Sequence, residues 1–177
     1  YLSLIVMIAT NNMVVAVSYT LMVDDGETGM RWYENVTDAD PFYFLFGRHN
    51  LLPALEQALE GKAAGDSFSV FIGFEEGYGD YDDSKKVIIP KANFKEDGKK
   101  NRDLLRVGNV IPMQDDKGNH LRGEVLKVDY MGVHLDFNSP LAGLDLQFDG
   151  KIVSIREAVP VEIEHGHVHG PDGHHHH

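Results

Sequence analysis

Three histidines near the end of the chain have the spacing that most directly suggests chemistry. His165, His167 and His169 occupy alternate positions in the motif HGHVHG. In an extended backbone alternate side chains point the same way, so three imidazoles can converge on one ion. Imidazole suits nickel, zinc and copper. The pattern predicts a divalent-metal site on these residues, to which residues 174–177 add ligands unless they are an expression tag.

A second stretch, residues 41–66, suits a different kind of chemistry. Its sequence, PFYFLFGRHNLLPALEQALEGKAAGD, runs from an aromatic strand through a glycine into a short apolar helix. None of its residues is an obvious acid, base or nucleophile. Its side chains can instead build an aromatic and aliphatic pocket that accepts an apolar peptide segment.

The composition narrows the range of partners. The chain has 177 residues, a formal net charge of −12 and no cysteine. Phosphates and anionic lipid surfaces would be repelled, so we expect neither a nucleic-acid nor a membrane partner, whereas metal cations are favoured. Any metal site must use His, Asp or Glu. We expect a cytoplasmic monomer.

The first residues are apolar, but residues 1–9 are too few to span a bilayer. They lack the basic start and the clear cleavage site of a signal peptide. We interpret them either as sequence upstream of a natural start at Met7 or as an extra strand.

The elements that must position these groups are mostly strands. Alternating or doubly apolar runs predict strands at 12–23, 42–46, 67–72, 107–113, 121–130, 133–137 and 146–156. The region after Gly79 is charged and rich in turns before its short strands begin, which indicates a compact β insert. From residue 162 the chain shows no packing pattern, so we expect a flexible tail.

One helix is predicted. Asn50 is a suitable N-cap, Leu55 and Leu59 lie on one apolar stripe, and Gly61 is a suitable stop. The preceding segment, residues 29–40, has the polar, irregular composition of a loop.

Several of these segments together resemble the FKBP-type peptidyl-prolyl isomerases. The stretch 41–66 resembles the core of that family, and Tyr78-Gly79 resembles its Ala-Tyr-Gly loop. The sequence PLAGLDLQFDGKIVSIREA, residues 140–158, resembles its closing strand. The histidine motif, and the long insert after Gly79, are similar to those of the SlyD subgroup.

The resemblance implies an α+β, mostly β fold: an antiparallel half-barrel around one short helix, with an inserted β-rich insert-in-flap domain. The isomerase domain would comprise residues 7–79 and 141–160, the insert 80–140 and a His-rich tail 161–177. The implied activity is cis–trans isomerisation of X–Pro bonds without a cofactor. The insert implies chaperone activity towards unfolded or proline-containing polypeptides, and the tail implies binding of nickel or zinc.

The resemblance also implies site residues. Those expected to line the pocket are Tyr19, Phe42, Leu51, Leu52, Leu55, Tyr78 and Phe148, and further substrate contacts are expected from Trp32, Tyr33, Leu141 and Ala142. The Tyr78 hydroxyl would bind a substrate carbonyl, and Phe148 would pack on the proline ring. Phe44, Phe68 and Phe71 are expected to fill the core.

One position departs from the family pattern. The family places an Asp in the loop after the first strand, whereas the matching position of this chain is Tyr33 counted back from Pro41, or Met30 counted forward from Gly26. Three alternatives are open: Glu34 replaces it, the Tyr33 hydroxyl replaces it, or the polar contact is absent.

Three functions remain in competition. The first is an isomerase whose insert captures unfolded chains, and the second is a holdase chaperone with little isomerase activity. The third is a nickel-handling protein that uses the tail. Apolar residues of the insert suit promiscuous binding or form that unit's own core; they are Val87, Ile88, Ile89, Phe94, Leu104 and Leu105.

Overall fold

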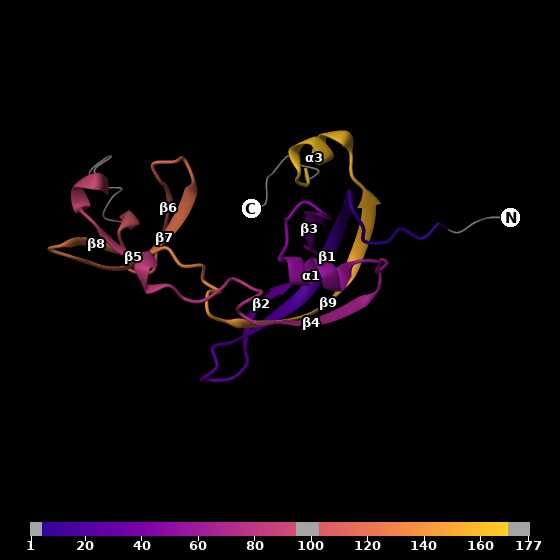
Figure 1. The fold of residues 1–177 in the computed structure, drawn as a ribbon, viewed down its shortest axis with the longest axis horizontal. Helices are drawn as coiled ribbons and strands as arrows, with labels where there is room; N and C mark the ends of the chain where they lie inside the picture. The colour runs from indigo at the N-terminus through magenta and orange to yellow at the C-terminus, as the bar shows by residue number, and fades with distance from the viewer. Residues whose placement is uncertain (1–4, 95–102, 170–177) are drawn as a thin grey trace. The chain divides into compact units, whose positions relative to one another are not determined.

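The computed structural model describes residues 5–94 and 103–169, which form two units (Figure 1). The first unit comprises the residues up to Gly79 and those from Gly143 onwards, and the second is Asp80–Ala142. The two passages of chain that connect the units meet where the Gly143 amide donates to the Gly79 carbonyl at 2.6 Å. Residues 174–177, considered above as extra ligands, lie outside the described residues.

The first unit is built on a five-stranded antiparallel sheet. Four strands follow the order β2 (Arg31–Val36), β1 (Met13–Asp24), β9 (Asp145–Glu157), β4 (Ser67–Ile72). The fifth, β3 (Phe42–Leu45), pairs with the first half of β1. The last strand therefore lies in the middle of the sheet, between β1 and β4.

One face of this sheet is covered by the helix α1 (Pro53–Leu59), whose Leu55 and Leu59 are buried. The helix ends as predicted, because Gly61 adopts the left-handed conformation just beyond it. The predicted N-cap is wrong: the cap residue is Leu52, which makes no side-chain cap bond. The Asn50 side chain instead donates to the carbonyls of Arg48 and Gly166.

Residues 31–36 form the strand β2 where a loop was predicted. The sequence pattern hides this strand because it lies at the edge of the sheet and most of its residues are exposed. The register with β1 shifts between Leu21 and Met22, so that Leu21 faces Glu34 while Met22 faces Trp32. The prediction that Phe71 fills the core is also wrong, since its side chain is exposed.

The segment after β9 also differs from the prediction of a flexible tail beginning at residue 161. A short helix, α3 (Pro160–His165), follows β9 and is terminated by Gly166 in the left-handed conformation. No apolar stripe indicates this helix, because its one fully buried side chain is that of the acidic Glu162.

The second unit has its own four-stranded antiparallel sheet and its own core. The strand order is β5 (Lys86–Ile89), β8 (Gly132–Asp136), β7 (His120–Asp129), β6 (Val110–Gln114). Two short 3-10 helices, η1 (Asp83–Lys85) and η2 (Lys91–Phe94), flank β5. The core residues are Ile111, Val125, Val133 and Leu135, against which Ile89, Phe94, Leu105, Met113 and Phe137 pack.

The apolar residues of the insert therefore divide into two groups. Ile89, Phe94 and Leu105 contribute to the core of the unit, whereas Val87, Ile88 and Leu104 are exposed. The predicted mostly β fold with antiparallel sheets and few helices is confirmed. In the described parts of the chain, no helix has the length and apolar character needed to cross a membrane.

Candidate functional site

The register of the first sheet places several predicted site residues on one face. Tyr19 lies two residues from Val17, which pairs with Phe42, and two residues from Leu21, which pairs with Phe148. Side chains directly opposite in an antiparallel pair share a face, and alternate residues along a strand do so too. Tyr19, Phe42 and Phe148 therefore project from the same face of the sheet.

Tyr19 makes two specific contacts on this face. Its hydroxyl donates a hydrogen bond to Glu34 Oε1 at 2.9 Å. Its ring meets the ring of buried Phe148 edge to face, with centroids 5.3 Å apart and planes at 71°. Burial, followed by the charge of Glu34 and this hydrogen bond, raises the pKa of Tyr19. The phenol therefore stays protonated and keeps its ring and hydroxyl in place.

A glycine across the strands permits this arrangement. Gly150 of β9 pairs with Tyr19. A Cβ at Gly150 would overlap the carbonyl oxygen of Ser18 and would lie 2.8 Å from the Cα and Cβ atoms of Tyr19. The two backbones therefore approach each other more closely than any larger residue allows.

Tyr78 completes the polar part of the site. Its side chain is 46% exposed, and its pKa is raised by burial and then by the charges of Glu34 and Tyr33, which lie close enough to act on it. The loop that carries it is anchored where the Phe74 amide donates to Asp145 Oδ1 at 2.9 Å. The loop closes where the Gly79 amide donates to the Phe74 carbonyl at 2.8 Å.

The remaining predicted pocket residues are more apolar. Phe42 is half-buried and stacks near Phe44, with centroids 6.3 Å apart and planes at 19°. Leu51 and Leu52 are half-buried just before α1, and Leu55 is buried within it. Phe44 and Phe68 are buried, as the core prediction required.

Trp32, one of the predicted substrate contacts, does not project from this face. Trp32 is 60% exposed and faces Met22, on the side of the sheet opposite to Leu21 and Tyr19. Its indole nitrogen donates to Asn35 Oδ1 at 3.2 Å. Leu141 and Ala142 are half-buried in the second unit, where their amides donate to Ser139.

The structure distinguishes between the three alternatives for the aspartate that this chain lacks. Glu34 supplies a carboxylate that binds Tyr19, and it does so from β2, opposite Leu21. Tyr33 is the extra residue at the irregularity in β2, and it is the smallest of the causes that raise the pKa of Tyr78. Sequence reasoning named Glu34 but did not foresee the strand that carries it.

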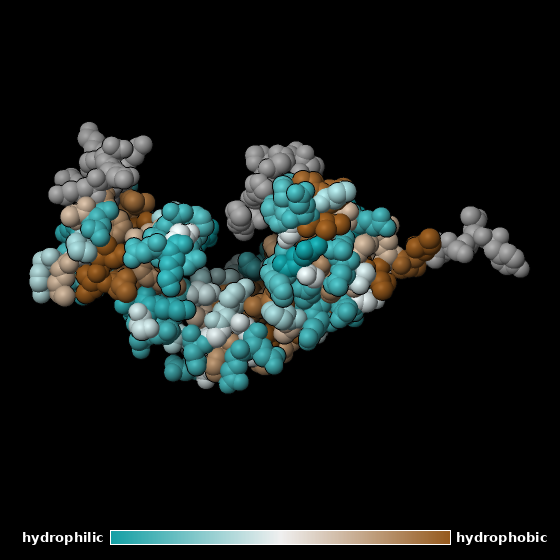
Figure 2. Space-filling view, turned by 45° about the horizontal axis from the view of Figure 1, so that its top comes forward, coloured by the Kyte–Doolittle hydropathy of each residue, from teal (hydrophilic) through white to brown (hydrophobic). Residues whose placement is uncertain are grey.

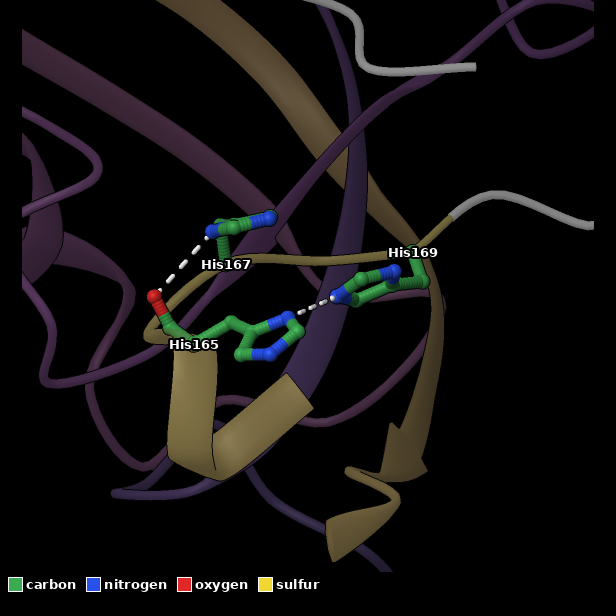
Figure 3. A group of neighbouring side chains, drawn as sticks. All are labelled: His165, His167 and His169. Carbon is green, nitrogen blue, oxygen red and sulfur yellow. Dashed lines mark hydrogen bonds between the residues drawn. The ribbon is translucent and has the colours of Figure 1, made fainter. Parts of the chain in front are cut away.

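The three histidines form a second cluster at the end of α3 (Figure 3). One ligand nitrogen from each of His165, His167 and His169 lies within 4.8 Å of the others. His165 Nδ1 and His169 Nε2 are 3.0 Å apart, and the rings of His167 and His169 stack with centroids 4.9 Å apart. The backbone is not extended as expected: His165 ends the helix, and Gly166 reverses the chain.

Glu162 organises this turn, a role that sequence reasoning missed. Its carboxylate accepts hydrogen bonds from both terminal nitrogens of Arg156, at 2.7 and 2.9 Å. It also accepts from the amides of Val159 and His169, each at 3.0 Å. The Arg156 hydrogen bonds, and then these amides, lower the pKa of Glu162 to about 2 against the cost of burial.

Comparison with known proteins identifies the family. A family model described as FKBP-type peptidyl-prolyl cis-trans isomerase matches residues 7–95. The chain is 37% identical over 161 residues to FKBP-type peptidyl-prolyl cis-trans isomerase SlyD of Yersinia pestis, covering 91% of this chain and 77% of that protein. The chain belongs to the FKBP-type peptidyl-prolyl cis-trans isomerase family.

Other relatives of this FKBP-type chain carry the same name. It is 37% identical to SlyD of Haemophilus influenzae, over 90% of this chain and 78% of the relative. It is 35% identical to SlyD of Escherichia coli K12, over 90% and 76% respectively. The predicted resemblance to SlyD-like FKBP-type isomerases is confirmed. The family-model match spans Tyr19, Glu34 and Tyr78, whereas Phe148 and the histidines lie beyond it.

Proposed function

We propose that this enzyme isomerises X–Pro peptide bonds at the face formed by Tyr19, Phe42, Tyr78 and Phe148. The observation that carries the proposal is the Tyr19–Glu34 hydrogen bond beside the Tyr19–Phe148 ring contact, in a chain of the FKBP-type family. Leu51, Leu52 and Leu55 add the aliphatic part of the same pocket.

The reaction needs positioning and not a nucleophile. Rotation about a peptide bond has a barrier of about 18–20 kcal/mol because it breaks amide resonance. Both isomers of an X–Pro bond are thermally accessible. A twisted amide carries less negative charge on its oxygen than a planar one. An apolar site that excludes water therefore disfavours the planar amide more than the twisted one, which lowers the barrier.

Each polar group has a defined part in this scheme. Tyr78 offers a protonated hydroxyl to a substrate carbonyl, and its raised pKa keeps that proton in place. Glu34 binds the Tyr19 hydroxyl and so fixes the ring that packs against Phe148. Phe148 presents its ring to proline.

The test is the refolding of a protein limited by trans-to-cis proline isomerisation. Catalytic amounts of the wild type should accelerate refolding, and Tyr78→Phe should lower the rate constant roughly three- to tenfold, the value of one hydrogen bond. Tyr81→Phe is a matched control, because its 44% exposure is similar and its hydroxyl binds Asp136 in the second unit. Absence of acceleration by the wild type would refute the proposal, and equal loss in both variants would remove Tyr78 from the site.

Binding of unfolded chains by the second unit is a further part of the proposal. The observation that supports it is the exposure of apolar side chains on this unit, which appear as brown areas in Figure 2. They include Val87, Ile88, Val107, Val110 and Met131, and the neighbouring Tyr130 is 94% exposed. Suppression of aggregation should persist in Tyr78→Phe. If the wild type suppresses aggregation but shows no isomerase activity, the holdase alternative is correct.

Metal binding by the histidine turn is the second candidate function. The donor set fits, because three imidazole nitrogens already lie within 4.8 Å of one another and imidazole suits nickel and zinc. His165, His167 and His169 would hold the ion, which would be a bound cargo or a structural tie and not a participant in isomerisation. Titration of the protein with NiCl₂ or ZnCl₂, followed by calorimetry, tests this. The expected cytoplasmic location and monomeric state stay predictions.

A further inference from the structure

We infer that Glu162, held by Arg156, positions the histidine turn for metal binding before any ion arrives. The inference rests on the metal site proposed above and assigns it a positioning residue that is not itself a ligand. Glu162 belongs to α3, whereas Arg156 belongs to β9, so the pair also joins the turn to the central strand of the first sheet.

The carboxylate of Glu162 is fully committed to hydrogen bonds. Its side chain is 0% exposed and lies against an Arg156 side chain that is 47% exposed. The Arg156 guanidinium donates to both carboxylate oxygens, the bidentate geometry with the strongest directional preference. One oxygen also accepts from the Val159 amide at the start of α3, and the other from the His169 amide.

These bonds fix the first and last ligands relative to each other. His165 follows Glu162 on α3, and the chain then turns at Gly166 and returns so that the His169 amide reaches the same carboxylate. The Gly166 carbonyl also accepts from Asn50 Nδ2 at 3.1 Å. The turn is therefore closed by the carboxylate and tied at its apex.

One of the three distances between ligand nitrogens, that of the hydrogen-bonded pair His165 and His169, is close to the distance in a coordination shell, and all three nitrogens lie within 4.8 Å of one another. Nitrogen ligands lie about 2.0–2.1 Å from zinc in tetrahedral sites, which places neighbouring donors roughly 3.3 Å from each other. The 3.0 Å between His165 Nδ1 and His169 Nε2 is already near that value. A ligand turn that is ordered in advance loses less conformational freedom on binding the ion.

Glu162→Gln should therefore weaken nickel or zinc binding about 10- to 100-fold, as loss of outer partners of metal ligands typically does. Glutamine keeps the size of the side chain but replaces an acceptor oxygen with an NH₂ group that faces a donor. Glu164→Gln is the matched control, because Glu164 is exposed on the same helix and its substitution should change the affinity less than about twofold.

The decisive experiment is a double-mutant cycle with His169→Ala, measured by NiCl₂ titration of the full chain. If Glu162 acts by placing His169, Glu162→Gln should cost less than about twofold in the His169→Ala background. A loss that stays tenfold there would mean that the pair only holds α3 as a whole, and would overturn the inference. Equal affinity of the wild type and Glu162→Gln would overturn it too, while leaving the metal site standing.

A measurement on the metal-free wild type keeps the inference testable if Glu162→Gln does not fold. The His169 amide should exchange its hydrogen slowly without metal, because it is bound to Glu162. Exchange at the rate of an unprotected amide would show that the turn is not ordered in advance. A wild type that binds neither nickel nor zinc would refute the metal site, and the inference with it.

Discussion

The aromatic face and the histidine turn are built in opposite ways. The aromatic face, formed by Tyr19, Phe42, Tyr78 and Phe148 with Glu34 beside them, draws on four strands and a loop. The ligands of the histidine turn come from residues 165–169, at one helix end. The first arrangement exists only when the whole sheet is paired, whereas the second depends on one buried carboxylate. Their chemistry differs as well, because the turn needs deprotonated imidazoles and the face needs no change of charge.

The largest expected effect is a loss of nickel affinity at the histidine turn that leaves the aromatic face unaffected. His167→Ala removes one of three ligands and should lower nickel affinity on the order of 100-fold or more. The refolding rate constant should stay unchanged, because none of the groups on the aromatic face is touched. His120→Ala, an exposed histidine on β7, is the control for the loss of an imidazole. A parallel fall in isomerase activity would contradict the independence of the two sites.

The next largest effect concerns the first sheet, where one substitution should lower stability and isomerase activity but leave nickel affinity unchanged. Gly150→Ala should destabilise the protein by about 3 kcal/mol, since the new Cβ overlaps the backbone at Ser18 and Tyr19. Urea unfolding measures this change. The isomerase activity should fall in the folded fraction, because Tyr19 must move, while nickel affinity is retained. Gly73→Ala controls for the loss of backbone freedom, since Gly73, like Gly150, has no positive φ and its Cβ would meet only Asp145 Oδ1, at 3.8 Å. Equal effects of the two substitutions would show that the close approach does not matter.

A smaller effect sharpens the role of the acid on the aromatic face. Glu34→Gln replaces a charged acceptor by a neutral one, so kcat/KM should fall about threefold. The pKa of Tyr19 should move down towards its ordinary value, because the charge of Glu34 is one of its causes, although burial still keeps it high. An NMR titration of the tyrosines reports that shift. An unchanged pKa would show that Glu34 does not act on Tyr19, and Glu27→Gln serves as an exposed control.

The smallest expected effect is that of pH on isomerase activity at the aromatic face. Because the pKa values of Tyr19 and Tyr78 are raised, both hydroxyls keep their protons, and isomerase activity should stay level from pH 7 to about pH 10. Stability should fall above that pH, since the unfolded chain loses its tyrosine protons first. Metal affinity should instead fall as the pH is lowered, because protons compete for imidazole. A loss of activity between pH 8 and 9 would contradict the assignment.

The stability of the histidine turn should depend on pH in the acid range. The pKa of Glu162 is about 2 in the folded protein, below its ordinary value of 4.5. The stability that this carboxylate contributes is present above its ordinary pKa and is lost as the pH falls towards 2. Hydrogen exchange of the His169 amide across this range should show the loss locally.

The alternation of apolar residues predicted the bounds of the two longest strands to within one residue. The prediction of 12–23 compares with Met13–Asp24, and that of 146–156 with Asp145–Glu157. These strands have one strongly apolar face, and burial of that face selects both the strand and its register. The edge strand β2 was missed because it buries little, and the irregular register that turns Trp32 away from Tyr19 leaves no signal in the sequence.

The candidate site was predictable only through resemblance. Nothing in the spacing of Tyr19, Tyr78 and Phe148 indicates that they meet, because the strands that unite them are far apart in the chain. The helix α3 was missed for a physical reason: its contact with the sheet is an Arg156–Glu162 ion pair, and a hydrophobic pattern does not reveal such a contact. The histidines were predictable because their ligand set is local.

The central place of β9 has a consequence for synthesis on the ribosome. This strand lies between β1 and β4, yet it follows the whole second unit in the chain. Translation proceeds at roughly 5–20 residues per second, so several seconds separate the appearance of β4 from that of its partner. During that interval the insert can complete its own sheet while β4 still lacks the strand beside it. The nascent first unit is therefore an incomplete sheet, and the aromatic face on which we place isomerisation lacks Phe148 until β9 appears.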